Sequence, residues 1–167
     1  MFGGPSSGKS TSAMELSSHL KWNKTLAEYV PEFAKELCWE NRASVFNNQV
    51  YVFAKQHHSI YRLLGQVDVV ITDSPIILSI IYNKTHPHLN EFILEEFKNF
   101  NNLNFYLHRT KEYVKIGRYQ TEQEAHEIDT DIKVLLQKHD IPHVDIVAKE
   151  GVSIEMAHHV RSALNLL

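Results

Sequence analysis

The sequence predicts a three-layer α/β domain, with a mainly parallel sheet and helices on both faces. Strand-like and helix-like apolar stretches alternate along the chain, which is the pattern of parallel βαβ units. The stretch 67–72 is rich in β-branched residues and ends at a Ser74–Pro75 break, as expected of a buried central strand. The 167 residues are 43% hydrophobic and contain no linker-like segment. We therefore expect one domain spanning 1–167.

Each element follows from its local pattern. Ala13, Leu16 and Leu20 recur on one face of the first predicted helix, and Pro31 ends the first predicted strand because proline lacks an amide hydrogen. Helices are predicted at 9–20, 32–41, 49–64, 89–100, 121–139 and 153–166. Strands are predicted at 25–30, 67–72, 103–108 and 144–147.

The segment GGPSSGKST near the start of the chain has the spacing of a phosphate-binding loop. Glycines allow backbone torsions that bring successive N–H groups onto phosphate oxygens at a helix N-terminus. We expect Lys9 to reach the β- and γ-phosphates of ATP and Ser10 to ligate Mg²⁺. The alternative is a Gly/Ser turn that ends in Lys-Ser by chance. The candidate nucleotide-binding residues are Gly3, Gly4, Pro5, Ser6, Ser7, Gly8, Lys9, Ser10 and Thr11.

A phosphate-binding loop normally follows a hydrophobic strand in the middle of the sheet. Only Met1 and Phe2 precede the loop in this sequence. We expect the first strand to be truncated, either because the chain is shortened from a longer protein or because this strand is reduced to almost nothing.

Asp73 ends the apolar run VVITD, where a parallel strand delivers its last residue to the ligand-binding edge of the sheet. A carboxylate at this edge can hold Mg²⁺ directly or through water. Asp is also common as a helix N-cap or turn residue before proline, which is the alternative interpretation.

Glu28 and Glu32 lie in the segment AEYVPEF, just inside the predicted strand 25–30 and just after it. A carboxylate at this point can orient, or accept the proton of, a hydroxyl that attacks the γ-phosphorus. Both glutamates are candidate catalytic residues, although isolated glutamates are usually only solvated.

Four basic residues lie between a predicted strand and a predicted helix, in a candidate lid over 109–120. Such cations can close over a triphosphate and stabilise the transferring phosphoryl group, although surface loops also commonly carry basic residues. Arg118 is the preferred candidate because Gly117 gives the backbone beside it freedom to move. The four are Arg109, Lys111, Lys115 and Arg118.

His57 and His58 lie among aromatic residues of the predicted helix 49–64. This helix could stack a nucleobase, although aromatics at helical spacing are more often part of a core. The eleven histidines of the chain lack the spacing of a zinc site, so no metal other than Mg²⁺ is expected.

The bulk composition excludes several classes of protein. A formal net charge of -3 gives no general attraction to nucleic acid or to anionic membranes. The apolar runs are too short to span a bilayer, and no secretion signal is visible. The single cysteine, Cys38, cannot form an internal disulfide, which fits a reducing cytoplasm.

The motifs GGPSSGKST, EYVPEF, VVITDSP and GRYQTEQEA together resemble the P-loop kinase/ATPase family that includes the nicotinamide-riboside kinase domain of NadR-type proteins. The resemblance is closer to short, phage-encoded members known as AAA-domain or ATP-binding proteins. It implies a P-loop NTPase fold of the nucleoside/nucleotide-kinase type, and host cytoplasm as the location. Lys9, Ser10, Asp73 and Arg118 match the family's triphosphate, Mg²⁺ and lid residues.

The leading functional prediction is ATP-dependent transfer of the γ-phosphate to a hydroxyl of a nucleoside, nucleotide or nicotinamide riboside. One alternative is a DNA kinase that acts on a hydroxymethylated base or a 5′ end, for which the acidic balance is unfavourable. The other alternative is a regulatory module that binds ATP and transfers nothing.

Overall fold

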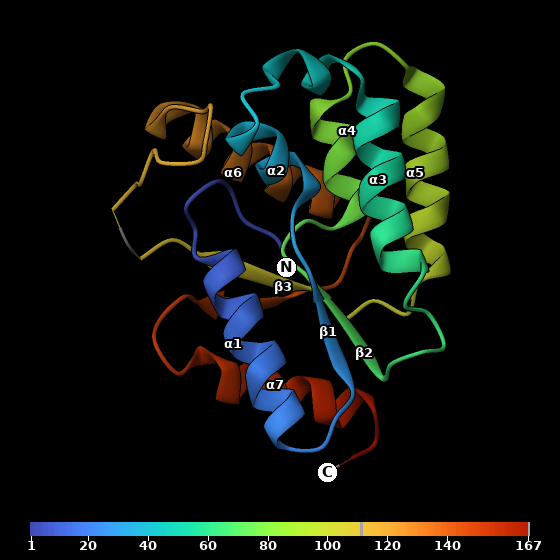
Figure 1. Ribbon diagram of the computed structural model, residues 1–167, viewed down its shortest axis with the longest axis vertical. Coiled ribbons are helices and arrows are strands. Elements are labelled where there is room, and N and C mark those ends of the chain that lie inside the picture. Colours follow the sequence, from blue (N-terminus) through green and yellow to red (C-terminus); the bar gives the residue numbers. More distant parts are fainter. Residues whose placement is uncertain (111, 167) are drawn as a thin grey trace.

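The computed structural model describes residues 1–110 and 112–166 and confirms the α/β class (Figure 1). The elements are α1 (Lys9–Trp22), β1 (Ala27–Val30), α2 (Phe33–Trp39), η1 (Ala43–Asn47), α3 (Gln49–Tyr61), β2 (Val69–Thr72), η2 (Ile76–Leu78), α4 (Ser79–Tyr82), α5 (Pro87–Asn99), β3 (Phe105–His108), α6 (Glu122–Lys138), β4 (Val144–Val147) and α7 (Val152–Ala163). The elements η1 and η2 are short 3₁₀ helices.

The strands form two parallel pairs, β1 with β2 and β3 with β4. Met1 and Phe2 lie between the pairs. The amide of Phe2 donates to the Phe105 carbonyl at 2.7 Å, and its carbonyl accepts from the Leu107 amide at 2.9 Å. On the other side the Met1 amine donates to the Thr72 carbonyl at 2.8 Å. These two residues therefore hold the central place in the sheet, and the loop that follows begins at its middle.

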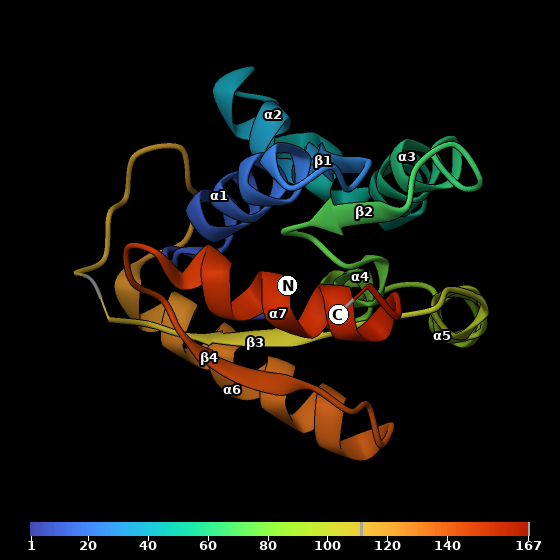
Figure 2. The ribbon, with the colours of Figure 1, turned by 90° about the horizontal axis from the view of Figure 1, so that it is seen from below.

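The sheet has an apolar core on each face, which gives the predicted three layers. One core packs α1 and α7 against β3 and β4 through residues such as Leu16, Ile146 and Met156. The other packs α3, α5 and α6 around Phe2 and Ile77. Figure 2 shows α7 and α6 on opposite sides of β3 and β4. Within the described residues, no helix is long and apolar enough to cross a membrane.

Most element predictions are confirmed with shifts of one to three residues at their ends. The strand expected at 67–72 begins at Val69 and is central. It was predicted to be buried, but Val69 and Val70 are only partly buried. The short helices η2 and α4, which follow Pro75, were not predicted. Their apolar run reads equally well as strand or helix, since runs of this length carry no decisive periodicity.

The helix α6 starts at a capping box that fixes its direction as the chain leaves the lid segment. The Thr121 side chain accepts a hydrogen bond from the Glu124 amide at 3.2 Å, and the Glu124 carboxylate accepts one from the Thr121 amide at 2.6 Å. These bonds lower the pKa of Glu124. Helical spacing then places Ala125, Asp129 and Ile132 on one inward face.

Candidate active site

The predicted phosphate-binding loop connects Phe2 to the first turn of α1. Gly8 precedes the helix with φ of 94°, in the left-handed region that glycine occupies without strain. A Cβ atom at this position would lie 3.0 Å from the Ala148 side chain. The amides of the first turn of α1 consequently open at the end of the sheet, where an anion is stabilised by the helix dipole.

The side chain of Lys9 folds back along the loop. Its Nζ donates hydrogen bonds to the carbonyl oxygens of Gly3, at 2.7 Å, and Gly4, at 2.9 Å. Burial lowers the pKa of Lys9, and the nearby Glu32 carboxylate is the strongest opposing influence. The ammonium group is therefore held by neutral carbonyls, so an anionic phosphate group would be the stronger partner for its protons.

Asp73 directly follows β2 at the same edge of the sheet and is 1% exposed. Its Oδ2 accepts hydrogen bonds from the Ser10 hydroxyl and from the Tyr29 hydroxyl, the latter at 2.9 Å. Its Oδ1 is buried without a hydrogen-bond partner. The pKa of Tyr29 is raised mainly by burial and secondly by the nearby charge of Asp73. A buried carboxylate oxygen beside a serine hydroxyl is a donor set that suits Mg²⁺.

The two candidate glutamates lie in different places. Glu32 lines the cleft, where burial raises its pKa and the Lys9 ammonium group opposes that change. Glu28 is 46% exposed and pairs with Lys21 at 2.8 Å on the surface. It is not among the residues that line the cleft. Glu28 is therefore held on the surface by Lys21, near the end of α1, and not in the cleft that Glu32 lines.

The described basic residues of the predicted lid lie in different places. Arg118 lines the cleft, and its Nη1 donates to the Ile116 carbonyl at 3.1 Å. Arg109 instead contacts the nucleotide loop from behind, through the Pro5 carbonyl at 2.6 Å. Lys115 is exposed and outside the cleft lining, and Lys111 lies outside the described residues.

The segment that carries Arg118 nevertheless reaches both sides of the cleft. The Val114 amide donates to the Ser6 side chain of the nucleotide loop at 3.1 Å. The Tyr119 ring packs edge-on against Phe46 of η1, with ring centroids 5.5 Å apart. These contacts bring the Arg118 side chain to the space between the loop and α2.

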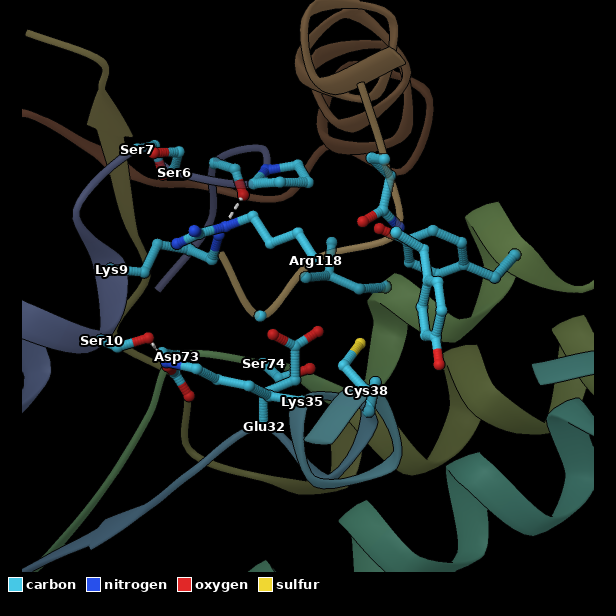
Figure 3. A pocket seen from close by; sticks show the side chains of 18 of the residues that line it. Ser6, Ser7, Lys9, Ser10, Glu32, Lys35, Cys38, Asp73, Ser74 and Arg118 are labelled. Carbon is cyan, nitrogen blue, oxygen red and sulfur yellow. Dashed lines mark hydrogen bonds between the residues drawn. The ribbon is translucent and has the colours of Figure 1, made fainter. Parts of the chain in front are cut away.

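The cleft has a volume of about 520 Å³. In Figure 3 the side chains of Lys9, Arg118 and Glu32 surround one open space. Away from the nucleotide loop, the cleft is lined by the aromatic rings of Phe46, Tyr82 and Tyr119 and by one buried amide. The residues of this distal end are Phe46, Gln49, Val52, Tyr82, Lys84 and Tyr119.

Gln49 supplies that buried amide. Its Nε2 donates to the Phe46 carbonyl at 2.7 Å, while its Oε1 is buried and without a hydrogen-bond partner. An unpaired buried acceptor costs folding free energy, on the order of 1–3 kcal/mol. A ligand that offers an N–H or O–H group at this point would satisfy it. Sequence reasoning missed Gln49, because a glutamine at the start of a helix carries no local signal of function.

The aromatic stretch of α3 does not face the cleft. His57 pairs with Glu96 of α5 at 2.9 Å and stacks on Phe53, with ring centroids 5.5 Å apart. Neither His57 nor His58 lines the cleft, which agrees with the favoured interpretation that the aromatic residues of this helix pack in the core. Helical periodicity turns the aromatic face toward α5, and the first turn of α3 alone reaches the site.

No group of three His, Cys, Asp or Glu side chains in the described part of the chain could hold a metal ion. Mg²⁺ in nucleotide sites commonly takes one or two protein ligands and completes its shell with phosphate oxygens and water. Ser10 and Asp73 fit that mode of binding.

Comparisons with known proteins give one family and one fold. A family model described as an AAA domain matches residues 1–152. The solved structure of a deoxyadenosine kinase from M. mycoides, with the products dCMP and a flexible dCDP bound, is similar with a TM-score of 0.56 and 17% sequence identity. That match covers 99% of this chain and 97% of the other. Among curated proteins, the comparison found no match.

Proposed function

Since the chain belongs to the AAA-domain family, we propose that it is an ATP-dependent kinase that transfers the γ-phosphate to a hydroxyl group of a nucleoside, nucleotide or nicotinamide riboside. The observation that carries the proposal is the placement of Glu32 across one cleft from Lys9 and from the Ser10–Asp73 pair. A nucleotide-holding loop, an acid for a metal ion and a partly buried base therefore share one space.

Each residue has a distinct role in the proposed transfer. Lys9 and the loop amides bind the β- and γ-phosphates, and Arg118 approaches them from the lid. Ser10 and Asp73 would hold Mg²⁺, which would neutralise phosphate charge. Glu32 accepts the proton of the acceptor hydroxyl as its oxygen attacks the γ-phosphorus. The bond from the γ-phosphorus to the bridging oxygen breaks, and ADP leaves.

Glu32 suits the role of base because of its surroundings. Its raised pKa makes the carboxylate a stronger base than an exposed glutamate, while Lys9 keeps the charged form accessible. Glu28 has no comparable position, since Lys21 holds it on the surface. Of the two glutamates, we therefore assign the proton transfer to Glu32.

The distal end of the cleft favours an acceptor with a planar base. Aromatic side chains line it, and the free Oε1 of Gln49 offers an acceptor for a base N–H group. The resemblance to NadR-type kinases keeps nicotinamide riboside among the candidates, since its carboxamide also carries N–H groups. If the protein is phage-encoded, as the closer resemblance suggests, it would act in the cytoplasm of the host.

The proposal is tested with labelled ATP and a panel of acceptors. Nucleosides, nucleoside monophosphates, nicotinamide riboside and hydroxymethylated DNA are incubated separately with the protein and Mg²⁺, and calorimetry measures Mg-ATP binding in parallel. We expect transfer to at least one small acceptor. Label on DNA alone would establish the DNA kinase instead. Binding of ATP with transfer to no acceptor would identify a regulatory module.

A further inference from the structure

A nearly buried ion pair lies behind the phosphate-binding loop, on the side away from the cleft. Arg109, just after β3, donates through Nη2 to Oδ2 of Asp129 on α6 at 2.7 Å. The two side chains are 11% and 19% exposed. Neither residue lines the cleft. The pair is therefore shielded from water but separate from the space where nucleotide and acceptor would bind.

Both members of this pair also bind the backbone of the loop. Asp129 Oδ1 accepts a hydrogen bond from the Gly4 amide at 2.5 Å, and Arg109 Nη1 donates to the Pro5 carbonyl at 2.6 Å. Two consecutive loop residues are thus held by one planar guanidinium–carboxylate unit. Charge-assisted bonds of this kind are shorter and stronger than neutral ones, and their fork geometry fixes direction as well as distance.

The loop packs so closely against α6 that the position of Gly4 leaves no space for a side chain. A Cβ atom at Gly4 would lie 2.6 Å from the Ala125 carbonyl and 2.7 Å from Asp129 Oδ1. The Gly4 amide points to Asp129, so it is not available to a phosphate group. The bond instead fixes the Gly3–Gly4 peptide, and the Gly3 carbonyl of this peptide accepts a hydrogen bond from Lys9 Nζ at 2.7 Å. The Asp129 carboxylate and the Lys9 ammonium group are therefore connected through a single peptide group.

We propose that Asp129 and Arg109 are positioning residues, which set the conformation of the phosphate-binding loop and hold Lys9 in register for Mg-ATP without touching it. The proposal rests on nucleotide binding at this loop, as proposed above, but not on phosphoryl transfer. It replaces the sequence-based prediction of Arg109 as a lid cation. It also couples β3 and α6, the elements on either side of the lid, to nucleotide binding.

The test compares Mg-ATP affinity, by calorimetry, among four single variants and one double variant. Asp129→Ala removes both bonds of the carboxylate, and Arg109→Met removes the bond to Pro5 together with the ion pair to Asp129. Arg109→Lys keeps the positive charge but replaces the guanidinium group, which donates through two nitrogens, by a single ammonium group. Asp131→Ala is the matched control, because Asp131 is exposed on the same helix. The double variant combines Asp129→Ala with Arg109→Met.

We expect the dissociation constant for Mg-ATP to rise about 10- to 100-fold in Asp129→Ala, the range seen when a residue that orients a ligand-binding group is removed. The dissociation constant should rise less in Arg109→Met and least in Arg109→Lys. It should not change in Asp131→Ala. The double variant should bind about as weakly as Asp129→Ala alone, because both residues act on the same stretch of backbone. The KM for the phosphate acceptor should stay within about twofold of the unaltered value, since the acceptor end of the cleft is untouched.

The possible results separate this proposal from the kinase proposal. A lower melting temperature in Asp129→Ala with unchanged Mg-ATP affinity would show a purely structural ion pair and overturn the positioning role. Fully additive losses in the double variant would also contradict it. If the unaltered protein binds Mg-ATP but transfers phosphate to no acceptor, while Asp129→Ala binds more weakly, the kinase proposal fails and the positioning role stands.

Discussion

Ser10 donates a hydrogen bond directly to the carboxylate of Asp73, although 63 positions separate the two residues. The contact forms where the first turn of α1 meets the carboxyl end of β2, beside the Met1–Phe2 segment. A hydroxyl and a carboxylate brought together at a helix N-terminus combine the oxygen ligands of a cation with the amide donors of an anion. This pairing is what a magnesium nucleotide requires.

Replacing Asp73 should remove the Mg²⁺ dependence of nucleotide binding. In Asp73→Asn we expect Mg²⁺ to improve ATP affinity far less than in the unaltered protein, because the buried carboxylate beside Ser10 is replaced by an uncharged amide. Tyr29→Phe removes one donor to the same carboxylate and should weaken the Mg²⁺ effect by about tenfold or less. Calorimetry with ATP, with and without Mg²⁺, measures both effects. Asp140→Asn is the control, and an unchanged Mg²⁺ effect in Asp73→Asn would contradict the metal assignment.

Lys9→Ala should lower the rate of phosphoryl transfer by about 10²–10³-fold, as removal of one preorganised donor to a developing charge does. The fold should remain intact, since Lys9 is partly exposed and its hydrogen bonds are to loop carbonyls. Circular dichroism and a melting curve check the fold. The exposed Lys24→Ala serves as the matched variant. Unaltered turnover in Lys9→Ala would remove Lys9 from the mechanism.

The predictability of this site depends on how far its residues lie apart in sequence. The loop and Asp73 could be proposed from the sequence because one is a contiguous motif and the other follows a recognisable strand. Tyr29 was missed, because its approach to Asp73 depends on the register that pairs Tyr29 with Ile71. Strand register depends on the packing of both sheet faces, which no single segment encodes.

Arg109 was assigned to the lid together with Arg118, because both residues follow β3. Neighbouring basic residues on an irregular segment can face different surfaces, and Arg109 turns toward Asp129 on α6. The parallel sheet and its layers were predictable because they follow from hydrophobic periodicity. The positions of the individual charged side chains were not predictable, because contacts between elements distant in sequence determine them.

Glu32→Gln should abolish transfer while Mg-ATP affinity stays close to that of the unaltered protein. Loss of a general base typically costs about 10²–10⁴-fold in rate. Glu28→Gln is the matched control, and it should transfer at the normal rate because Glu28 lies in a surface ion pair. Steady-state kinetics with a working acceptor measures both variants. Equal losses in the two variants would argue against Glu32 as the base.

The rate should fall in acid with a midpoint above the ordinary glutamate value of 4.5, since burial raises the pKa of Glu32. Below that midpoint Glu32 carries a proton and cannot accept another from the acceptor hydroxyl. The pH profile of kcat/KM reports this ionisation in the free enzyme. The acidic limb should be absent from the residual activity of Glu32→Gln. An unchanged limb in that variant would assign the ionisation to another group.

Gln49→Leu should weaken acceptor binding and leave nucleotide binding unchanged. It removes the buried, unpaired Oε1 of a residue that lines the distal end of the cleft, and with it the proposed bond to a base N–H group. We expect the acceptor KM to rise about tenfold or more, in line with the loss of a bond worth 1–3 kcal/mol of discrimination, and Mg-ATP affinity to stay the same. The exposed Gln66→Leu is the control. A parallel loss of affinity for Mg-ATP would place Gln49 in the nucleotide half of the cleft instead.

Glu32→Gln should also make the ligand-free protein more stable at neutral pH. A carboxyl group whose pKa is raised on folding binds its proton more tightly in the folded chain than in the unfolded chain. Stability therefore falls as the pH rises from the unfolded value, 4.5, through the folded one. Glutamine imitates the protonated form at every pH, so the melting temperature of Glu32→Gln should exceed that of the unaltered protein at pH 8. The difference should shrink as the pH falls below 4.5, and a difference that grows in acid would reverse the sign of the pKa shift.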